Sequence, residues 1–273
     1  MDIYRSTMLV FIIHLTGCKL LIANYPGCVT AMTGGNYGGS NLSPFHIACA
    51  NGSLELVEYL YNLHPDDDYE YDDDGNFMDE FDLPESLQCG YYALHFAASS
   101  HHDERKEVIR FVLEKDGQAA SRVGKWGRLP LHEACSSNLN IGVIKAIFEA
   151  YPKAIHAEDM FGRLPIHFVM GCHEYRKHRF EGRSPPVHSS KRQTALVIEY
   201  LVKQLPYSLK AKDPEGRVCA HFACGSSLAL RKTKAIEDKC PESFKVFIAT
   251  VMGSLSMLLA QKGRRLMLLV VWC

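Results

Sequence analysis

One short segment recurs along this chain and limits the folds that the chain can adopt. Residues 127–135 read GRLPLHEAC, and residues 162–170 read GRLPIHFVM. Three looser copies read SPFHIAC at 43–49, YALHFAA at 92–98 and CAHFAC at 219–224. The histidines that anchor the five copies are His46, His95, His132, His167 and His221, spaced 49, 37, 35 and 54 residues apart. A period near 35 residues predicts a repeat array, in which insertions lengthen the two wider spacings.

The copies also show the pattern of two short helices. Pro44, Pro130 and Pro165 stand just inside a helix start, where the missing N–H group of proline costs nothing. After the first copy, the sequence Asn-Gly-Ser at 51–53 provides a turn and a helix cap, and apolar residues recur at helical spacing over 54–61. The same plan recurs over 108–113 and over 141–148. The sequence therefore predicts a helix–turn–helix unit for each copy.

This plan resembles the ankyrin repeat, whose core is a PLHxA segment followed by a turn, a second helix and a loop returning through Asp and Gly. The segments at 127–134 and 162–167 match it closely, whereas the copies at 93–97 and 219–223 lack the proline. The resemblance covers about residues 15–250. It implies an all-α solenoid of stacked helix–turn–helix units with hairpin-like loops, about five repeats and a partial N-terminal one.

The repeat register divides the chain into three parts. We expect a partial N-terminal repeat and loop over 1–42, the ankyrin array over 43–243, and an apolar C-terminal helix or cap over 244–273. The array would carry an acidic insertion at 64–88 and a basic insertion at 173–193. The apolar run at 8–23 falls where the second helix of a repeat belongs, which favours a truncated repeat over a signal peptide.

Comparison of the copies argues against a metal site at His132 and Cys135. The position of Cys135 is occupied by cysteine in three copies, but by Ala98 and Met170 in the other two. A shared zinc ligand cannot alternate with a methyl group, whereas a small or soft core residue can. The anchor histidines are therefore expected to be structural, each tying two chain segments together through one donor and one acceptor. We expect no metal and no cofactor.

The two insertions have opposite charge. From Asp66 to Glu85 there are eleven acids and no Lys or Arg, which is typical of a solvated loop. Docking of a basic partner and calcium binding are the alternatives, although a calcium loop centred on Gly75 would place Phe81 where glutamate is required. The basic insertion is expected to be a surface loop. Contact with phosphates, with an acidic peptide or with the acidic loop of another copy is its alternative.

The function we predict is a non-catalytic protein–protein interaction module, an adaptor or scaffold. The sequence holds no GxSxG, P-loop or HExxH motif, and a net charge of −1 does not favour nucleic-acid binding. The resemblance implies an unknown protein partner bound by the concave face and the inter-repeat loops. The predicted contact residues are Trp126, Arg128, Asp159, Met160, Phe161, Arg163, Lys212, Asp213 and Arg217.

Arginine recurs after glycine in three of these loops, at Arg128, Arg163 and Arg217. A row of guanidinium groups at repeat spacing would bind carboxylates along a partner. The alternative is that each arginine bonds carbonyl groups of its own loop.

The remaining expectations concern compartment and assembly. Ten cysteines without regular pairing favour reduced thiols, and we expect a monomeric, cytoplasmic protein. One alternative is a membrane-anchored ankyrin protein that contacts the membrane through 244–273, where Lys262 and a Gly-Arg-Arg triplet divide an apolar stretch. Another is the regulatory ankyrin part of a signalling enzyme.

Overall fold

A computed structural model gives the fold in two compact units. It describes residues 15–29, 43–51, 53–63, 92–100, 104–137, 140–171 and 191–219, together with isolated positions from 222 to 253. The first unit comprises residues 1–133 and 149–151, and the second comprises 134–148 and 152–273. In the described parts of both units all regular elements are helical, and the only extended contacts are two isolated β-bridges that close hairpin loops.

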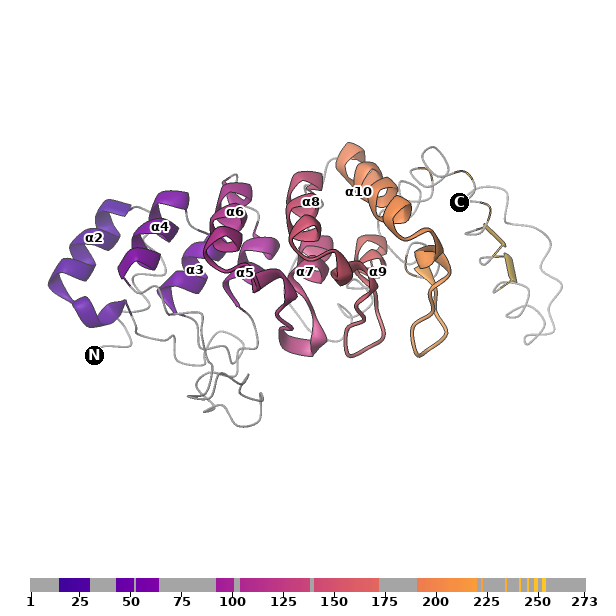
Figure 1. Ribbon diagram of the computed structural model, residues 1–273, viewed down its shortest axis with the longest axis horizontal. Coiled ribbons are helices and arrows are strands. Elements are labelled where there is room, and N and C mark those ends of the chain that lie inside the picture. The colour runs from indigo at the N-terminus through magenta and orange to yellow at the C-terminus, as the bar shows by residue number, and fades with distance from the viewer. Residues whose placement is uncertain are drawn as a thin grey trace. The chain divides into compact units, whose positions relative to one another are not determined.

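The first unit contains short helices alternating with longer ones (Figure 1). In chain order its elements are α2 (Leu15–Asn24), η1 (Pro26–Cys28), α3 (Pro44–Asn51), α4 (Leu54–Leu63), α5 (Ala93–Ser99), α6 (Arg105–Lys115), η2 (Ala119–Ser121) and η3 (Lys125–Gly127). Helix α7 (Pro130–Ser137) begins in this unit and ends in the second. The pairs α3–α4 and α5–α6 are the helix–turn–helix units that the sequence predicts.

The longer helices of the first unit are amphipathic. Helix α4 buries Leu56, Val57 and Leu60, and α6 buries residues at the equivalent positions, Val108, Ile109 and Val112. This spacing places the apolar side chains on one face of each helix, toward its neighbours. The short helix α5 is instead buried almost throughout, because it lies between α3 and α6. Small side chains such as alanine permit that close packing.

Polar and aromatic contacts also join α4 to α6. The backbone N–H of Leu54 donates to the Glu104 carboxylate, with 2.8 Å between the nitrogen and the oxygen. The rings of Tyr61 and Phe111 meet edge to face, with their centroids 5.4 Å apart. Edge-to-face contact is a favoured geometry for aromatic pairs, so these rings add to the burial that holds adjacent repeats together.

The second unit repeats this construction. Its elements are α8 (Ile141–Ala150), η4 (Pro152–His156), α9 (Pro165–Met170), α10 (Lys191–Gln204) and η6 (Pro206–Lys210). The last two residues of α8 fall in the first unit. Helices α8 and α10 each bury one apolar face, with Val143, Ile144 and Ile147 on α8. All six residues of α9 are buried. Phe148 and Tyr200 meet edge to face at 5.7 Å, as Tyr61 and Phe111 do in the first unit.

The all-α fold class is confirmed, and the structure refines two sequence-based boundaries. Helix α2 begins at Leu15, so the second half of the apolar run at 8–23 is helical. Helix α10 begins at Lys191, so residues 191–193 belong to this helix and not to the basic insertion. Gln193 accepts a hydrogen bond from the backbone N–H of Ile141 at 3.2 Å and thereby caps the start of α8.

Several predicted features lie outside the described residues. They are the acidic insertion at 64–88, the basic insertion from 173 to 190, His221, Cys224 and most of 244–273. Among the residues that are described, no helix combines the length and apolar character needed to span a bilayer.

We predict that Val108→Asp in α6 and Ile144→Asp in α8 will each destabilise the protein strongly. Both side chains are completely or almost completely buried, so either substitution places an unpaired carboxylate in a helix interface. The expected loss in the free energy of unfolding is about 4 kcal/mol, measured by urea denaturation. Arg110→Asp, on the exposed face of α6, is the control and should change it by less than about 0.5 kcal/mol. Wild-type stability of both buried variants would show that these positions do not face the core.

Candidate functional site

Three hairpin loops with the same backbone plan precede the short helices. We call them hairpin A (residues 124–128, in the first unit), hairpin B (159–163) and hairpin C (213–217), the last two in the second unit. In each, the first N–H donates to the carbonyl of the arginine four residues later, at 2.7 to 3.0 Å. The fourth residue is a glycine with φ between 63° and 74°, a conformation that other residues rarely adopt. This conformation therefore favours glycine at Gly127, Gly162 and Gly216.

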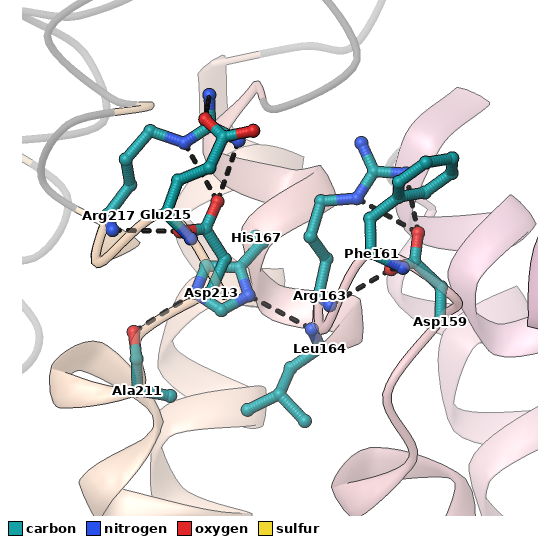
Figure 2. A network of polar contacts seen from close by, with 9 residues as sticks. All are labelled: Asp159, Phe161, Arg163, Leu164, His167, Ala211, Asp213, Glu215 and Arg217. Carbon is teal, nitrogen blue, oxygen red and sulfur yellow. Dashed lines mark hydrogen bonds and ion pairs between the residues drawn. The ribbon is translucent and has the colours of Figure 1, made fainter.

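Hairpin B is held by a buried aspartate–arginine pair (Figure 2). One carboxylate oxygen of Asp159 accepts the backbone N–H groups of Phe161 and Arg163, both at 2.9 Å. The other accepts the Nε and Nη2 groups of Arg163, at 2.9 and 2.5 Å. Arg163 is only 3% exposed. Its guanidinium also stacks near the rings of Phe161 and Phe168, 4.7 and 4.9 Å from their centroids, so this arginine is part of the loop's own framework.

Hairpin C repeats the arrangement nearer to the solvent. Asp213 accepts the backbone N–H groups of Glu215 and Arg217 at 3.0 and 2.8 Å, and the Nε group of Arg217 at 2.8 Å. The Glu215 carboxylate lies 2.5 Å from the Nη1 group of Arg217, and the arginine side chain is 30% exposed. A Cβ atom built on Gly162 would lie 2.5 Å from Cδ of Pro214, so hairpins B and C pack directly against each other.

The hydrogen bonds around Asp159 determine its charge. Burial of the carboxylate by itself raises its pKa, because desolvation disfavours the ionised form. The hydrogen bonds and the positive charge of Arg163, together with the N–H of Phe161, outweigh this effect and lower the pKa of Asp159 below its ordinary value. The aspartate is therefore ionised at neutral pH and holds the guanidinium in the loop.

Hairpin A lacks this pair. Gly124 stands where hairpins B and C have aspartate, and Arg128 binds the Glu133 carboxylate of α7 at 3.1 Å instead. Trp126 at the tip has φ 62° and ψ 26°, and it is the one non-glycine residue with positive φ among the described residues. For a bulky side chain this left-handed conformation costs on the order of 1–2 kcal/mol. Hairpin A is thus the strained loop of the three.

The anchor histidines join each short helix to a neighbouring segment. The backbone N–H groups of Leu129 and Leu164 donate to Nδ1 of His132 and His167, at 3.0 and 2.9 Å. Since Nδ1 accepts in His167, its proton lies on Nε2, which donates to the Ala211 carbonyl at 3.2 Å (Figure 2).

The first unit holds the same kind of link. His95 Nε2 donates to the Arg128 carbonyl at 2.9 Å, and Nδ1 of the same ring faces the N–H of Tyr92 at 3.4 Å. In His46 the Nδ1 atom bonds to the hydroxyl of Ser43 at 2.8 Å. The described histidines of the repeat thus hold the helix starts and, at His95 and His167, the following hairpin.

Burial keeps His167 neutral. Removal of the ring from water lowers the pKa of His167 below its ordinary value. The Ala211 carbonyl and the Asp213 carboxylate favour the charged form, while Arg163 opposes it, and the effect of burial prevails. A neutral ring is what the two hydrogen bonds require, because an imidazolium has no acceptor for the N–H of Leu164.

The structure separates the predicted contact residues into exposed and buried groups. Met160 and Trp126 are exposed by 64% and 38%, Lys212 is exposed, and Phe161 is half-buried. The buried members are Asp159, Asp213, Arg128 and Arg163, with Arg217 between the two groups. Each arginine binds a nearby carboxylate. The alternative that these arginines act within the protein therefore agrees with the geometry, and carboxylates are among their partners.

Sequence reasoning missed three features of these loops. The Asp-x-x-Gly-Arg spacing at 159–163 and 213–217 was a visible signal for the buried pair. No repeated residue pattern indicated that Glu133 binds Arg128, or that Tyr207 beside α10 is 76% exposed.

The position of Cys135 lies in the helix core. Cys49, Ala98, Cys135 and Met170, which share this repeat position, are at most 2% exposed. Within the described ranges, no three His, Cys, Asp or Glu side chains gather closely enough to hold a metal ion.

Comparisons with known proteins agree with this geometry. The family model "Ankyrin repeat" matches residues 40–68, which include α3 and α4. The probable 26S proteasome regulatory subunit p28 of Saccharomyces cerevisiae is 29% identical over 129 residues, covering 46% of this chain and 47% of the yeast protein. The matched region therefore spans about half the length of this curated relative.

Two solved structures share the fold. One comes from the complex of a predatory endopeptidase of Bdellovibrio bacteriovorus with an immunity protein, with a TM-score of 0.53 and 17% identity over 86% of this chain and 97% of that chain. The ankyrin repeat protein EF0377 gives a TM-score of 0.51 and 14% identity over 85% of this chain and 95% of that chain. At these identities the likeness concerns the fold alone.

We predict that Asp159→Asn will lower the free energy of unfolding by about 3 kcal/mol, because the Arg163 guanidinium would remain buried without a counter-charge. Asparagine has nearly the same shape, so the change tests the charge and not the packing. The control is Lys203→Gln, which removes the exposed pair with Glu199 and should cost less than about 0.5 kcal/mol. Equal losses in urea denaturation would contradict a special role for the buried pair.

We also predict a pH dependence that arises from His167. Its folded-state pKa is lowered, so the unfolded chain binds more protons, and stability is complete above the ordinary pKa of about 6.5. Stability should fall as the pH drops from there toward the folded-state pKa, by about 1.4 kcal/mol for each unit between the two values. Urea denaturation between pH 7.5 and 5 would measure the slope. His167→Gln should reduce it, while His156→Gln, at an exposed position, should leave it unchanged.

Proposed function

Because this chain is an ankyrin repeat protein, we propose that it is a non-catalytic protein–protein interaction module that serves as an adaptor or scaffold. Ankyrin repeats are generally protein–protein interaction modules. The yeast relative is named as a probable regulatory subunit of the 26S proteasome, and one structural neighbour comes from a complex with an immunity protein. Both names refer to proteins that assemble with others, which supports the same class of role for this chain.

The observation that carries the proposal is the combination of rigid hairpins with exposed tips. In hairpin B, the pair of Asp159 and Arg163 fixes the backbone from inside, while Met160 points large apolar surface outward. A loop that is already ordered loses little conformational entropy on binding, and large apolar side chains concentrate binding energy. Lys212, exposed just before hairpin C, adds a positive charge to the exposed residues of these loops.

The histidines also support a non-catalytic role. A general base needs a ring nitrogen that is available to a substrate. In His167 one nitrogen accepts a backbone N–H and the other donates to a backbone carbonyl, so the ring is used in holding the fold.

The cytoplasm is the compartment that we propose. Cys18, Cys49, Cys135 and Cys219 are each buried in the helix packing, where a reduced thiol acts as a small apolar group.

We predict that the double change Met160→Asp and Lys212→Glu will weaken capture of the partner at least about tenfold without lowering the melting temperature. Both side chains are exposed, so their loss removes binding surface and little folding energy. The measurement is affinity capture on the immobilised chain followed by quantitative mass spectrometry. Lys203→Glu is the control for the lysine substitution, because it makes the same charge change as Lys212→Glu at an exposed position of α10 outside the hairpins. If the wild-type chain retains no protein above an empty support, the proposed function is wrong.

A further inference from the structure

Hairpin A differs from hairpins B and C in what its internal contacts hold. In B and C the aspartate at the first position binds the tip N–H groups and the arginine from inside the loop. In A, Gly124 has no side chain, and Arg128 is bound to Glu133 in the first turn of α7. The ion pair of Arg128 therefore joins hairpin A to α7, whereas the corresponding arginines of B and C bind an aspartate inside their own loop.

The tip of hairpin A presents an apolar surface in a strained conformation. Trp126 has φ 62°, although glycine, asparagine or aspartate would occupy this region with less strain. Its indole remains 38% exposed, and Val123 just before the hairpin is 55% exposed. The large aromatic ring is therefore held in a strained conformation without being fully buried. Such outliers concentrate at sites where a partner or ligand is bound.

The charges around the indole indicate what the partner carries. Lys125 Nζ and the guanidinium of Arg128 lie 5.3 and 4.9 Å from the ring centroid of Trp126. Arg128 is bound to Glu133, whereas within the described part of the chain Lys125 forms no ion pair. Two cations already beside one ring disfavour a third, which argues against a basic segment or a quaternary ammonium ligand. The positive charge of Lys125 instead favours a carboxylate.

We propose that hairpin A is the specificity-determining contact for an acidic peptide segment of the partner protein, which places a large apolar side chain on Trp126 and an adjacent carboxylate on Lys125. This inference rests on the proposed function and adds the chemistry of the partner to it. The indole supplies the apolar contact area, and the ammonium group determines the charge of the partner segment. Hairpins B and C, which are held internally, contribute general contact area.

The test is selection from a random 12-residue peptide library displayed on phage, using the full immobilised chain as bait. The selected peptides should carry more Asp and Glu than Lys and Arg, with a large apolar residue next to an acid. The tightest peptide, synthesised and titrated by calorimetry, should bind at least about tenfold more weakly to Trp126→Asn and to Lys125→Glu. Asparagine accepts positive φ, so the first variant should keep the hairpin and the melting temperature.

Matched controls separate these effects from general changes at the surface. Tyr207→Asn removes another exposed aromatic side chain, and Lys203→Glu makes the same charge change elsewhere, so peptide affinity should be unchanged in both. The inference is overturned if the selected peptides are predominantly basic, if no peptide is enriched over phage without an insert, or if Trp126→Asn binds as tightly as the wild type. Partner capture that persists alongside any of these results would leave the proposed function standing.

Discussion

A buried, neutral histidine at the start of helix α9, His167, makes the contact that joins this repeat to the next one. In His167 one nitrogen accepts the N–H of Leu164 and the other donates to the Ala211 carbonyl, which lies two residues before hairpin C. The helix start is therefore capped by the same ring that positions the next loop. Burial maintains the neutral form, so the packing of the short helices and the placement of the hairpins depend on each other.

Within each hairpin, the contacts among its own side chains determine which residues are buried and which are exposed. Asp159 and Arg163 are both buried, and a buried ion pair is stabilising only when its geometry satisfies the charges. Here the carboxylate also binds two backbone N–H groups, so the pair fixes the path of the loop as well as its charge. Residues that the sequence suggests as binding groups are therefore structural, whereas neighbours such as Met160 are exposed and carry the proposed contact role.

The sequence was sufficient to predict the repeat and its helices, but not which loop residues are buried and which are exposed. Histidine spacing and the apolar positions of 54–61 predict α3 and α4 because packing between repeats imposes the same period everywhere. The exposure of Arg163 could not be predicted from its position alone. It depends on whether an aspartate four residues earlier points into the loop, and a side-chain contact of that kind is set by local geometry. The start of α10 is not marked in the sequence, because its first residues, Lys191 and Arg192, are charged like the predicted basic insertion before them.

The three hairpins show how one backbone plan accommodates different side-chain roles. All three close through the same hydrogen bond and the same left-handed glycine, so the backbone does not require an aspartate at the first position. Where aspartate is present, it accepts hydrogen bonds from the N–H groups of the tip and forms an ion pair with the arginine. Where it is replaced by Gly124, the arginine binds Glu133 of the following helix, and the tip residue Trp126 has a left-handed conformation. Strain at Trp126 is therefore compatible with a stable repeat, because the helix, and not the tip, now holds the base of the loop.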